Sequence, residues 1–207
     1  MSGRTRIMTG VLALGAVAIW LTVPVVSQDN ATASSTPDFN EMMAKWAALN
    51  AKGPEHAKLA QMVGTWDTET KMWMAPGAPP TVSHGTAEFR LILDGRYLEQ
   101  TFRGEVFGQP FEGRAVEGYD RIKKKYVSTW IDSMSTGFFI SEGTTDATGK
   151  VCTYYGKSHD PLTGELDKMM RSVAREVDAN TAVFEMYETR AGVGEIKSME
   201  ITYKRKR

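Results

Sequence analysis

The fold is decided by a turn and the strand that follows it, LDGRYLEQTFR at residues 93–103. The pair Asp94-Gly95 accepts the positive φ angles that a two-residue hairpin turn requires. Beyond it, apolar Leu98 and Phe102 alternate with polar or charged residues, and a period of two is typical of a β-strand with two different faces. This stretch therefore predicts a β-hairpin.

The same pattern extends outward from this hairpin, from Gly64 to the C-terminus. Short segments rich in Thr, Val, Tyr, Phe and Trp are separated by turn residues, which is typical of an up-and-down meander. The other turns are predicted at 108–110, 119–125, 146–149, 160–164, 178–180 and 192–194. About ten strands result, and closure into an antiparallel lipocalin-like barrel would leave no exposed sheet edge. A two-sheet sandwich is the alternative.

The N-terminus has the pattern of a secretory signal. Arg4 and Arg6 precede a run, 7–26, that carries no charge. Cleavage after 31–33 or after 25–27 would fit the small-residue rule, and the run is nearly long enough to span a bilayer uncleaved. We expect an exported protein, periplasmic or secreted, with 1–33 as signal peptide or membrane anchor and no other membrane contact.

Composition narrows the classes of partner and fold. Without 1–33 the chain has 23 basic and 24 acidic residues, a balance that argues against a nucleic-acid partner. The basic run 204–207 is expected to be a solvated chain end. Cys152 is the only cysteine, so neither an internal disulfide nor a lipid anchor on a cysteine near the signal is possible. A domain of about 150 residues needs no such staple.

The segment 34–63 joins the signal to the barrel domain, 64–207. It begins in a polar linker, and Thr36-Pro37 has the cap and first-turn residues of a helix start. Apolar residues then recur at helical spacing: Phe39, Met42, Met43, Trp46 and Leu49. A second short helix runs from Pro54 through Leu59 and Met62. An apolar stripe of this kind usually faces a core, so the helices within 37–62 are predicted to plug one end of the barrel.

Gly64-Thr65-Trp66 resembles the Gly-x-Trp opening of the first strand in lipocalin-like barrels. The resemblance implies structural roles for Gly64, which lets helix and strand meet closely, and for Trp66, which closes the barrel floor. It also implies that Arg205, on the last strand, covers Trp66 as a cation–π contact. If Trp66 points inward, the period of two places Thr68, Thr70 and Met72 inside with it.

Over the whole domain the sequence resembles a bacterial family described only as domain of unknown function 1579. The supporting segments are LDGRYL (93–98), FEG (111–113), GYD (118–120), YVSTWIDSMST (126–136), HDP (159–161) and KSME (197–200). Together they span nearly all of 54–207. The resemblance implies a lipocalin-like barrel and no particular activity, so function has to be argued from the residues.

The segment 130–136 gathers polar groups at one predicted mouth of the barrel. Trp130, Asp132, Ser133 and Ser135 could orient the polar head of a ligand while aromatic walls hold its body. Tyr154 and His159, from the predicted strand 151–158 and its end, complete the candidate ligand site. Alternatively, Asp132 and the two serines cap the amides of their own turn.

His159 suggests two further possibilities. With Asp132 and Ser133 it could form the catalytic set of a hydrolase or isomerase, although no Gly-x-Ser-x-Gly turn surrounds the serine and Asp160-Pro161 is ordinary hairpin chemistry. It could also bind haem, as in ten-stranded lipocalin-like haem proteins. His56 and His84 have no partner at ligand spacing, so no metal site and no other cofactor are expected.

The preferred function is therefore a non-enzymatic one. We expect the barrel to bind a small amphipathic or lipid-like molecule in a lumen lined by Trp, Tyr and Met with few charges. Charged residues that alternate on two predicted strands are expected to face solvent: Glu88, Arg90, Glu112 and Arg114. Nothing in the sequence predicts the oligomeric state.

Overall fold

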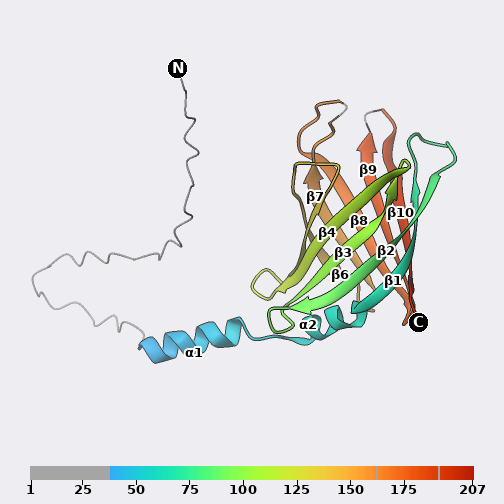
Figure 1. Ribbon diagram of the computed structural model, residues 1–207. Coiled ribbons are helices and arrows are strands. Elements are labelled where there is room, and N and C mark those ends of the chain that lie inside the picture. Colours follow the sequence, from blue (N-terminus) through green and yellow to red (C-terminus); the bar gives the residue numbers. More distant parts are fainter. Residues whose placement is uncertain (1–37, 162, 191) are drawn as a thin grey trace, which may run out of the picture. The chain divides into compact units, whose positions relative to one another are not determined.

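Ten antiparallel strands close into a single barrel in the computed structural model, which describes residues 38–161, 163–190 and 192–207 (Figure 1). The strands are β1 (Gly64–Met72), β2 (Thr81–Ile92), β3 (Tyr97–Val106), β4 (Gln109–Asp120), β5 (Lys125–Asp132), β6 (Phe139–Thr145), β7 (Val151–Ser158), β8 (Lys168–Asp178), β9 (Thr181–Arg190) and β10 (Gly194–Arg205). Each strand pairs with the next, and β10 pairs with β1. The predicted barrel is confirmed. The sandwich alternative is wrong, because one continuous sheet closes on itself.

The hairpin that decided the fold has the predicted turn. Asp94 and Gly95 have φ angles of 58° and 72°, and the amide of Arg96 donates to the carbonyl of Leu93 at 3.3 Å. Positive φ at both central positions defines the turn type whose twist matches that of the flanking strands. Local sequence therefore fixes how β2 and β3 pair.

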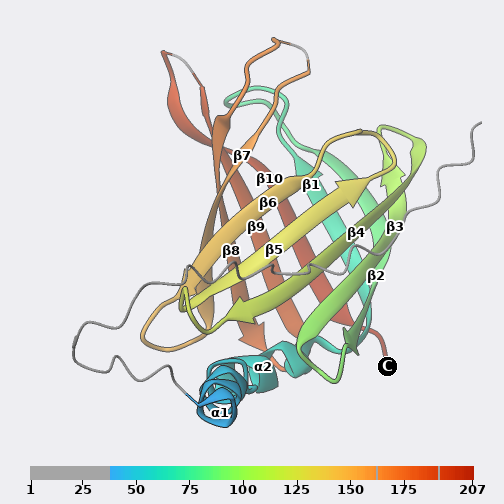
Figure 2. The ribbon, with the colours of Figure 1, turned by 90° about the vertical axis from the view of Figure 1, so that its left-hand side faces the viewer.

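One end of the barrel is closed by a short helix and the turn after it. Helix α2 (Pro54–Leu59) and the 3-10 turn η1 (Ala60–Met62) lie beneath the strands (Figure 2). His56 and Leu59 of α2 are buried, and the His56 ring packs edge-on against Tyr119. We call this the closed end. The loops β1–β2, β3–β4, β5–β6, β7–β8 and β9–β10 surround the opposite, open end.

Trp66 is the largest fully buried side chain of the described chain, only 1% exposed. Its Nε1 donates to the carbonyl of Met62 at 2.8 Å, and the Arg205 guanidinium lies 4.1 Å from its ring centre. Arg205 also donates to the carbonyls of Val63 and Gln61, each at 2.6 Å. The predicted cation–π contact is thus present, and the same guanidinium ties η1 to the last strand.

Gly64 has a φ of +127°, in the region that favours glycine. A Cβ atom built at this position would lie 3.0 Å from the guanidinium of Arg205. Glycine therefore allows both the bend from η1 into β1 and the close approach of the arginine.

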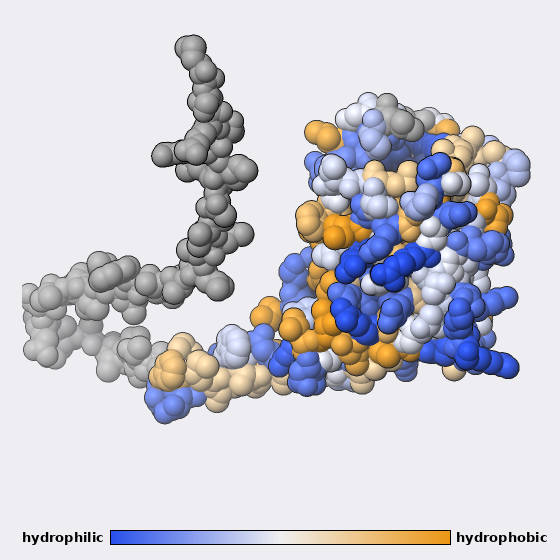
Figure 3. Space-filling model, in the orientation of Figure 1, coloured by the Kyte–Doolittle hydropathy of each residue, from blue (hydrophilic) through white to orange (hydrophobic). Residues whose placement is uncertain are grey.

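The helix α1 (Phe39–Leu49) corrects one prediction, because it does not plug the barrel. None of its residues is buried, and its apolar side chains are exposed along it (Figure 3). Its last turn is instead held by Arg121, which donates to the carbonyls of Ala48 and Ala51 at 3.0 and 2.9 Å. An apolar stripe at helical spacing forms whether or not a partner covers it, so the pattern alone misplaced this helix. Only the segment 54–62 closes the barrel.

No helix within the described ranges is long and apolar enough to cross a bilayer. The predicted signal, 1–33, and the cap residues Thr36 and Pro37 lie outside the described residues.

Candidate functional site

The strand register identifies the wall of the barrel interior. Residues paired across antiparallel strands share a face of the sheet, so the inward face can be followed from Trp66. One row of pairs runs Trp66, Ala87, Phe102, Gly113 and Asp132, and another runs Leu98, Glu117, Ser128, Ser141 and Gly156. Thr68, Thr70 and Met72 point inward with Trp66, as predicted.

The interior is packed at the closed end and accessible above it. Ala87, opposite Trp66, is 0% exposed. In contrast, Ala115 is half-buried although its methyl group points into the barrel. Larger inward side chains share this partial exposure: Gln100, Ser128, Trp130, Phe184, Met186 and Met199. These groups lie on the inner face of a closed sheet, so the interior above the floor is less tightly packed than the floor itself. We call this part of the interior the lumen.

The lumen wall is mainly aromatic and apolar near the open end. Phe111 stacks on Trp130 with ring centres 6.4 Å apart, and it meets Phe102 edge-on at 5.9 Å. The Trp130 ring lies over Gly113, where a built Cβ atom would come within 2.2 Å of Cζ2. Glycine at 113 is therefore required for the indole to lie flat against the wall.

A half-buried carboxylate lies lower in the lumen. Glu117 of β4 points inward, and its Oε1 accepts a hydrogen bond of 2.5 Å from the hydroxyl of Tyr154 on β7. Burial raises the pKa of Glu117 and outweighs the Tyr154 hydrogen bond and the charge of Lys58, which both lower it. Burial also raises the pKa of Tyr154 well above its usual value, and the nearby Glu117 charge adds to this.

Gly143 gives Tyr154 the room to reach Glu117. A Cβ atom built on Gly143 would lie 2.6 Å from Cδ1 of Tyr154, so the phenol ring passes directly over the glycine. The neighbouring Cys152 is 8% exposed, and burial raises the pKa of its thiol to about 11. Near neutral pH both the Tyr154 hydroxyl and the Cys152 thiol therefore keep their protons.

Three inward hydroxyl groups have no hydrogen-bond partner within the described part of the chain: Thr68, Thr70 and Ser172. All three residues are at most 5% exposed. A buried hydroxyl without a partner costs roughly 1–3 kcal/mol, so such groups commonly mark the place of an ordered water or a bound polar group.

The candidate ligand residues predicted at the open end mostly form hydrogen bonds within their own turn. Asp132 accepts hydrogen bonds of 2.9 Å from the Trp130 indole and from the amide of Met134. The Ser133 hydroxyl accepts from the amide of Glu112 at 3.1 Å. Ser135 is exposed in the β5–β6 loop. The capping interpretation thus describes Asp132 and Ser133, while Trp130 and Tyr154 do line the lumen.

The proposed catalytic trio is not assembled. His159 is exposed in the β7–β8 connection, at the same end of the barrel as Asp132 and Ser133. Among the described residues no hydrogen bond joins its imidazole to either of them, and both oxygens of Asp132 are committed elsewhere. The haem hypothesis for His159 stays a prediction, which titration with haemin and a search for a Soret shift would test.

A separate ion cluster lies inside the open end. Lys168, 8% exposed, contacts Glu188 at 2.8 Å and Asp160 at 3.4 Å, and Arg190 contacts Glu188 at 2.5 Å. Burial opposes ionisation of Glu188, but its two cationic partners outweigh this and lower its pKa. The carboxylate of Glu188 is therefore paired with two cationic side chains of the protein. Across the described ranges no group of three or more His, Cys, Asp and Glu side chains could hold a metal ion.

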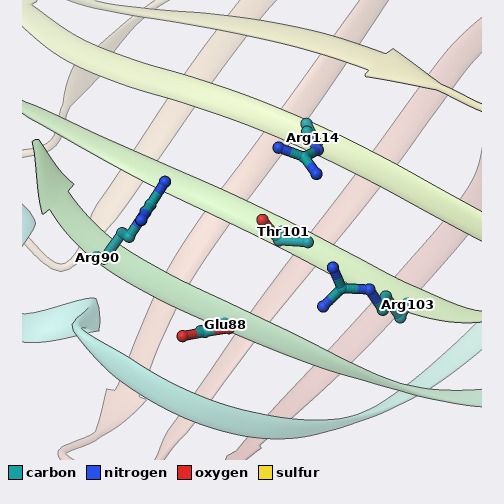
Figure 4. Close-up of a pocket in the computed structure, with 5 residues that line it drawn as sticks. All are labelled: Glu88, Arg90, Thr101, Arg103 and Arg114. Atoms are coloured by element: carbon teal, nitrogen blue, oxygen red, sulfur yellow. The ribbon is translucent and has the colours of Figure 1, made fainter.

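Two hollows lie on the outer wall. One, of about 210 Å³, is lined by Glu88, Arg90, Thr101, Arg103 and Arg114 from β2, β3 and β4 (Figure 4). The other, of about 240 Å³, is lined by Asp67, Thr68, Glu69, His84, Thr202 and Lys204. The charged residues expected to face solvent do so.

The arginines of the first hollow are paired. Arg90 binds Glu99, and Glu112 contacts Arg103 at 3.5 Å and Arg114 at 3.0 Å. Because these carboxylates offset the arginines, the hollow is not a strongly basic site.

Glu117 is the residue that sequence reasoning missed. Strand β4 carries polar residues in both alternation sets, so its pattern does not identify the inward face. The available signal was parity: Glu117 stands two residues before Tyr119 and six after Phe111, and both of these aromatic residues point inward.

The first of two similar solved structures supports the fold. The chain is similar to Rv2717c from M. tuberculosis, with 14% identity and a TM-score of 0.55, covering 76% of this chain and 100% of that one. It is also similar to a redesigned beta barrel, b11L5F_LGL, with 13% identity and a TM-score of 0.37, covering 72% of this chain and 95% of that one. No curated protein matches the chain.

The family model described as "Protein of unknown function (DUF1579)" matches residues 51–205. This range runs from the segment before α2 to the last residue of β10 and so includes the whole barrel. The chain therefore belongs to the DUF1579 family.

Proposed function

We propose that the barrel binds one small amphipathic molecule in its lumen, with the polar head toward the closed end and the apolar body against the aromatic wall. One observation carries the proposal: inward side chains above the floor, Ala115 and Trp130 among them, keep surface that solvent can reach. Binding sites for small molecules combine such an apolar wall with a few convergent polar groups. Here Gln100, Glu117 and Ser128 would supply the polar end.

The contrast with the closed end supports this arrangement. Trp66 and Ala87 show that this sequence can pack an interior position completely. In an empty lumen, the side chains of Trp130, Phe111 and the methionines of β9 and β10 would stay in contact with water. An apolar ligand body would cover them. Removal of that area from water, at about 25 cal/mol per Å², would be the main driving force of binding.

Filling the lumen tests the proposal. We expect the neutral fluorophore N-phenylnaphthylamine to bind the wild-type protein in a saturable way, with a blue-shifted emission. Ala115→Phe should weaken binding by about ten-fold, or 1.4 kcal/mol, while the protein still folds, because the new ring occupies open space. Val116→Phe, on the outward side of the same strand, is the matched control and should bind as wild type.

Each outcome either supports or contradicts the lumen as the binding site. Loss of binding in Ala115→Phe alone supports the lumen as the site. Equal binding by all three proteins, or no binding by wild type, contradicts the proposal. If Ala115→Phe fails to fold, the milder Ala115→Met takes its place, and native mass spectrometry of protein purified from its own cells gives an independent search for a bound molecule.

The molecule acts outside the cytoplasm in this proposal. The support is the sequence pattern of Arg4 and Arg6 before the uncharged run 7–26. Fusion of residues 1–40 to an alkaline phosphatase that is active only after export would give activity if the segment directs export. An inactive fusion that is present in the cytoplasm would contradict it.

A further inference from the structure

Glu117 differs from Glu185 and Glu188, two carboxylates of the neighbouring barrel wall, in how its charge is balanced. Glu185, on the outward face of β9 and 7% exposed, contacts Arg175 at 3.0 Å and Lys197 at 2.8 Å. Glu188 has Lys168 and Arg190. For Glu117, by contrast, the described residues provide no ion pair, and Tyr154 is its hydrogen-bond donor.

The charge of Lys58 in α2 acts on Glu117, but among the described residues the two groups form no ion pair. The Nζ of Lys58 would be 3.4 Å from a Cβ atom built on Gly149, in the β6–β7 turn beneath the barrel. It lowers the pKa of Glu117 from a distance without forming an ion pair with it, and the pKa remains raised. The carboxylate is thus left with one neutral donor in an environment that disfavours an isolated charge.

The surroundings of Glu117 are organised toward the lumen. Tyr154 is held over Gly143 and donates to Oε1, while no described group donates to Oε2. Ser128 is the cross-strand partner of Glu117 and also points inward. The rings of Tyr126 and Tyr154 and the indole of Trp130 belong to the same wall. A cation placed against Glu117 would therefore also lie near the hydroxyl groups of Tyr154 and Ser128 and within an aromatic wall, both of which favour it.

We infer that Glu117 anchors a protonated amine, so that the ligand class of the barrel is a cationic amphiphile with an ammonium head and an apolar body. The inference rests on the proposed function and names the head group of its ligand. The ammonium would supply the positive partner that Glu117 lacks, and charge-assisted hydrogen bonds of this kind are about twice as strong as neutral ones. The apolar body would lie against Trp130 and Phe111.

Three amphiphiles of equal chain length separate the contributions of head and body. We expect isothermal titration calorimetry at pH 7.5, below the micellar concentrations, to show decylammonium binding at least about ten-fold more tightly than decanol, and decanoate binding most weakly. Glu117→Gln should weaken decylammonium binding by about ten-fold and leave decanol within about two-fold. Glu105→Gln, exposed on the outward face of β3, is the matched control and should change neither.

The results distinguish this inference from the proposed function. Equal affinities for decylammonium and decanol, both blocked by Ala115→Phe, would overturn the amine head group and leave the lumen site standing. Tightest binding of decanoate would overturn it too, since Glu117 would then act as a protonated donor. Absence of binding by all three amphiphiles would contradict the lumen site itself. Circular dichroism of Glu117→Gln confirms that any loss of affinity comes from a folded protein.

Discussion

The two ends of the barrel are built from the same strands but are packed differently. At the closed end, Trp66 is surrounded by Ala87, by η1 and by the guanidinium of Arg205. The indole nitrogen and all three guanidinium nitrogens donate hydrogen bonds to backbone carbonyls. Above it, Ala115, Ser128 and Trp130 lie side by side on the inner wall of β4 and β5, and all three are only half-buried. A barrel of ten strands is too wide for one layer of side chains to fill throughout.

This difference in packing predicts which substitutions should change the free energy of unfolding. Substitutions at the closed end should cost stability in proportion to the packing that they remove. Substitutions in the lumen should cost little stability, and some should increase it, because groups there are not optimised for the empty state.

Trp66→Ala should break the closed end. Truncation of a fully buried aromatic side chain costs about 3–5 kcal/mol, because it removes apolar contact and leaves a cavity. Urea denaturation followed by circular dichroism measures the change. Trp46→Ala in α1, where the side chain is 60% exposed, is the control and should stay within about 0.5 kcal/mol. Similar losses in both variants would show that α1 is packed in solution.

Gly143→Ala should disturb the boundary between the two regions. The new methyl group would overlap the ring of Tyr154, and overpacking of this kind costs about 1–3 kcal/mol. Gly137→Ala is the control, since a Cβ atom at 137 meets nothing within 4 Å. Thermal unfolding of the two variants gives the comparison. An unchanged melting temperature for Gly143→Ala would mean that Tyr154 does not lie over the glycine.

Arg205→Lys should loosen the closed end less than loss of Trp66 does. Lysine keeps the charge above the indole but lacks the planar fork that donates to Val63, Gln61 and Ala179. We expect a loss of about 1–2 kcal/mol in the free energy of unfolding, measured by urea titration. Arg207→Lys, at the exposed chain end, should have no measurable effect. An unchanged free energy of unfolding in Arg205→Lys would indicate that the cation–π contact with Trp66 alone accounts for the effect of this residue.

Glu117→Gln should stabilise the ligand-free protein at neutral pH, by on the order of 1 kcal/mol, because it removes a buried charge. The pKa of Glu117 is raised in the folded state, so ionisation penalises folding increasingly as pH rises from the unfolded value of about 4.3 through the folded pKa. Below about pH 4 both states are protonated, and the advantage of glutamine should vanish. Melting temperatures of both proteins from pH 4 to pH 8 test this. An advantage that is independent of pH would exclude a titrating Glu117.

The sequence predicted the closed end far better than the lumen. Gly64, Trp66 and Arg205 act through contacts that a short motif and the last strand specify, and Asp94-Gly95 specifies its own turn. Parity from Trp66 correctly placed Thr68 and Thr70 inside. These features depend on neighbours in sequence or on one known strand pair.

The arrangement of side chains in the lumen depends on strand pairings that cannot be read from the sequence. Glu117 meets Tyr154 across three strand boundaries, and only the complete register of β4 to β7 brings them together. Asp132 looked more promising because it is bordered by hydroxyl groups, but such residues also make good turn caps. The prediction that α1 plugs the barrel was wrong for a related reason. Amphipathic spacing shows which residues share a face of a helix, but it does not show what covers that face.

The reactivity of Cys152 reports on transient opening of the barrel. Its thiol is the only one in the chain, is buried at the foot of β7, and stays protonated at neutral pH because its pKa is about 11. Only the exposed thiolate reacts quickly with alkylating reagents, so labelling of the native protein proceeds through transient separation of the strands around it. The rate of alkylation therefore measures how often the strands around Cys152 separate. A molecule bound in the lumen should lower this rate.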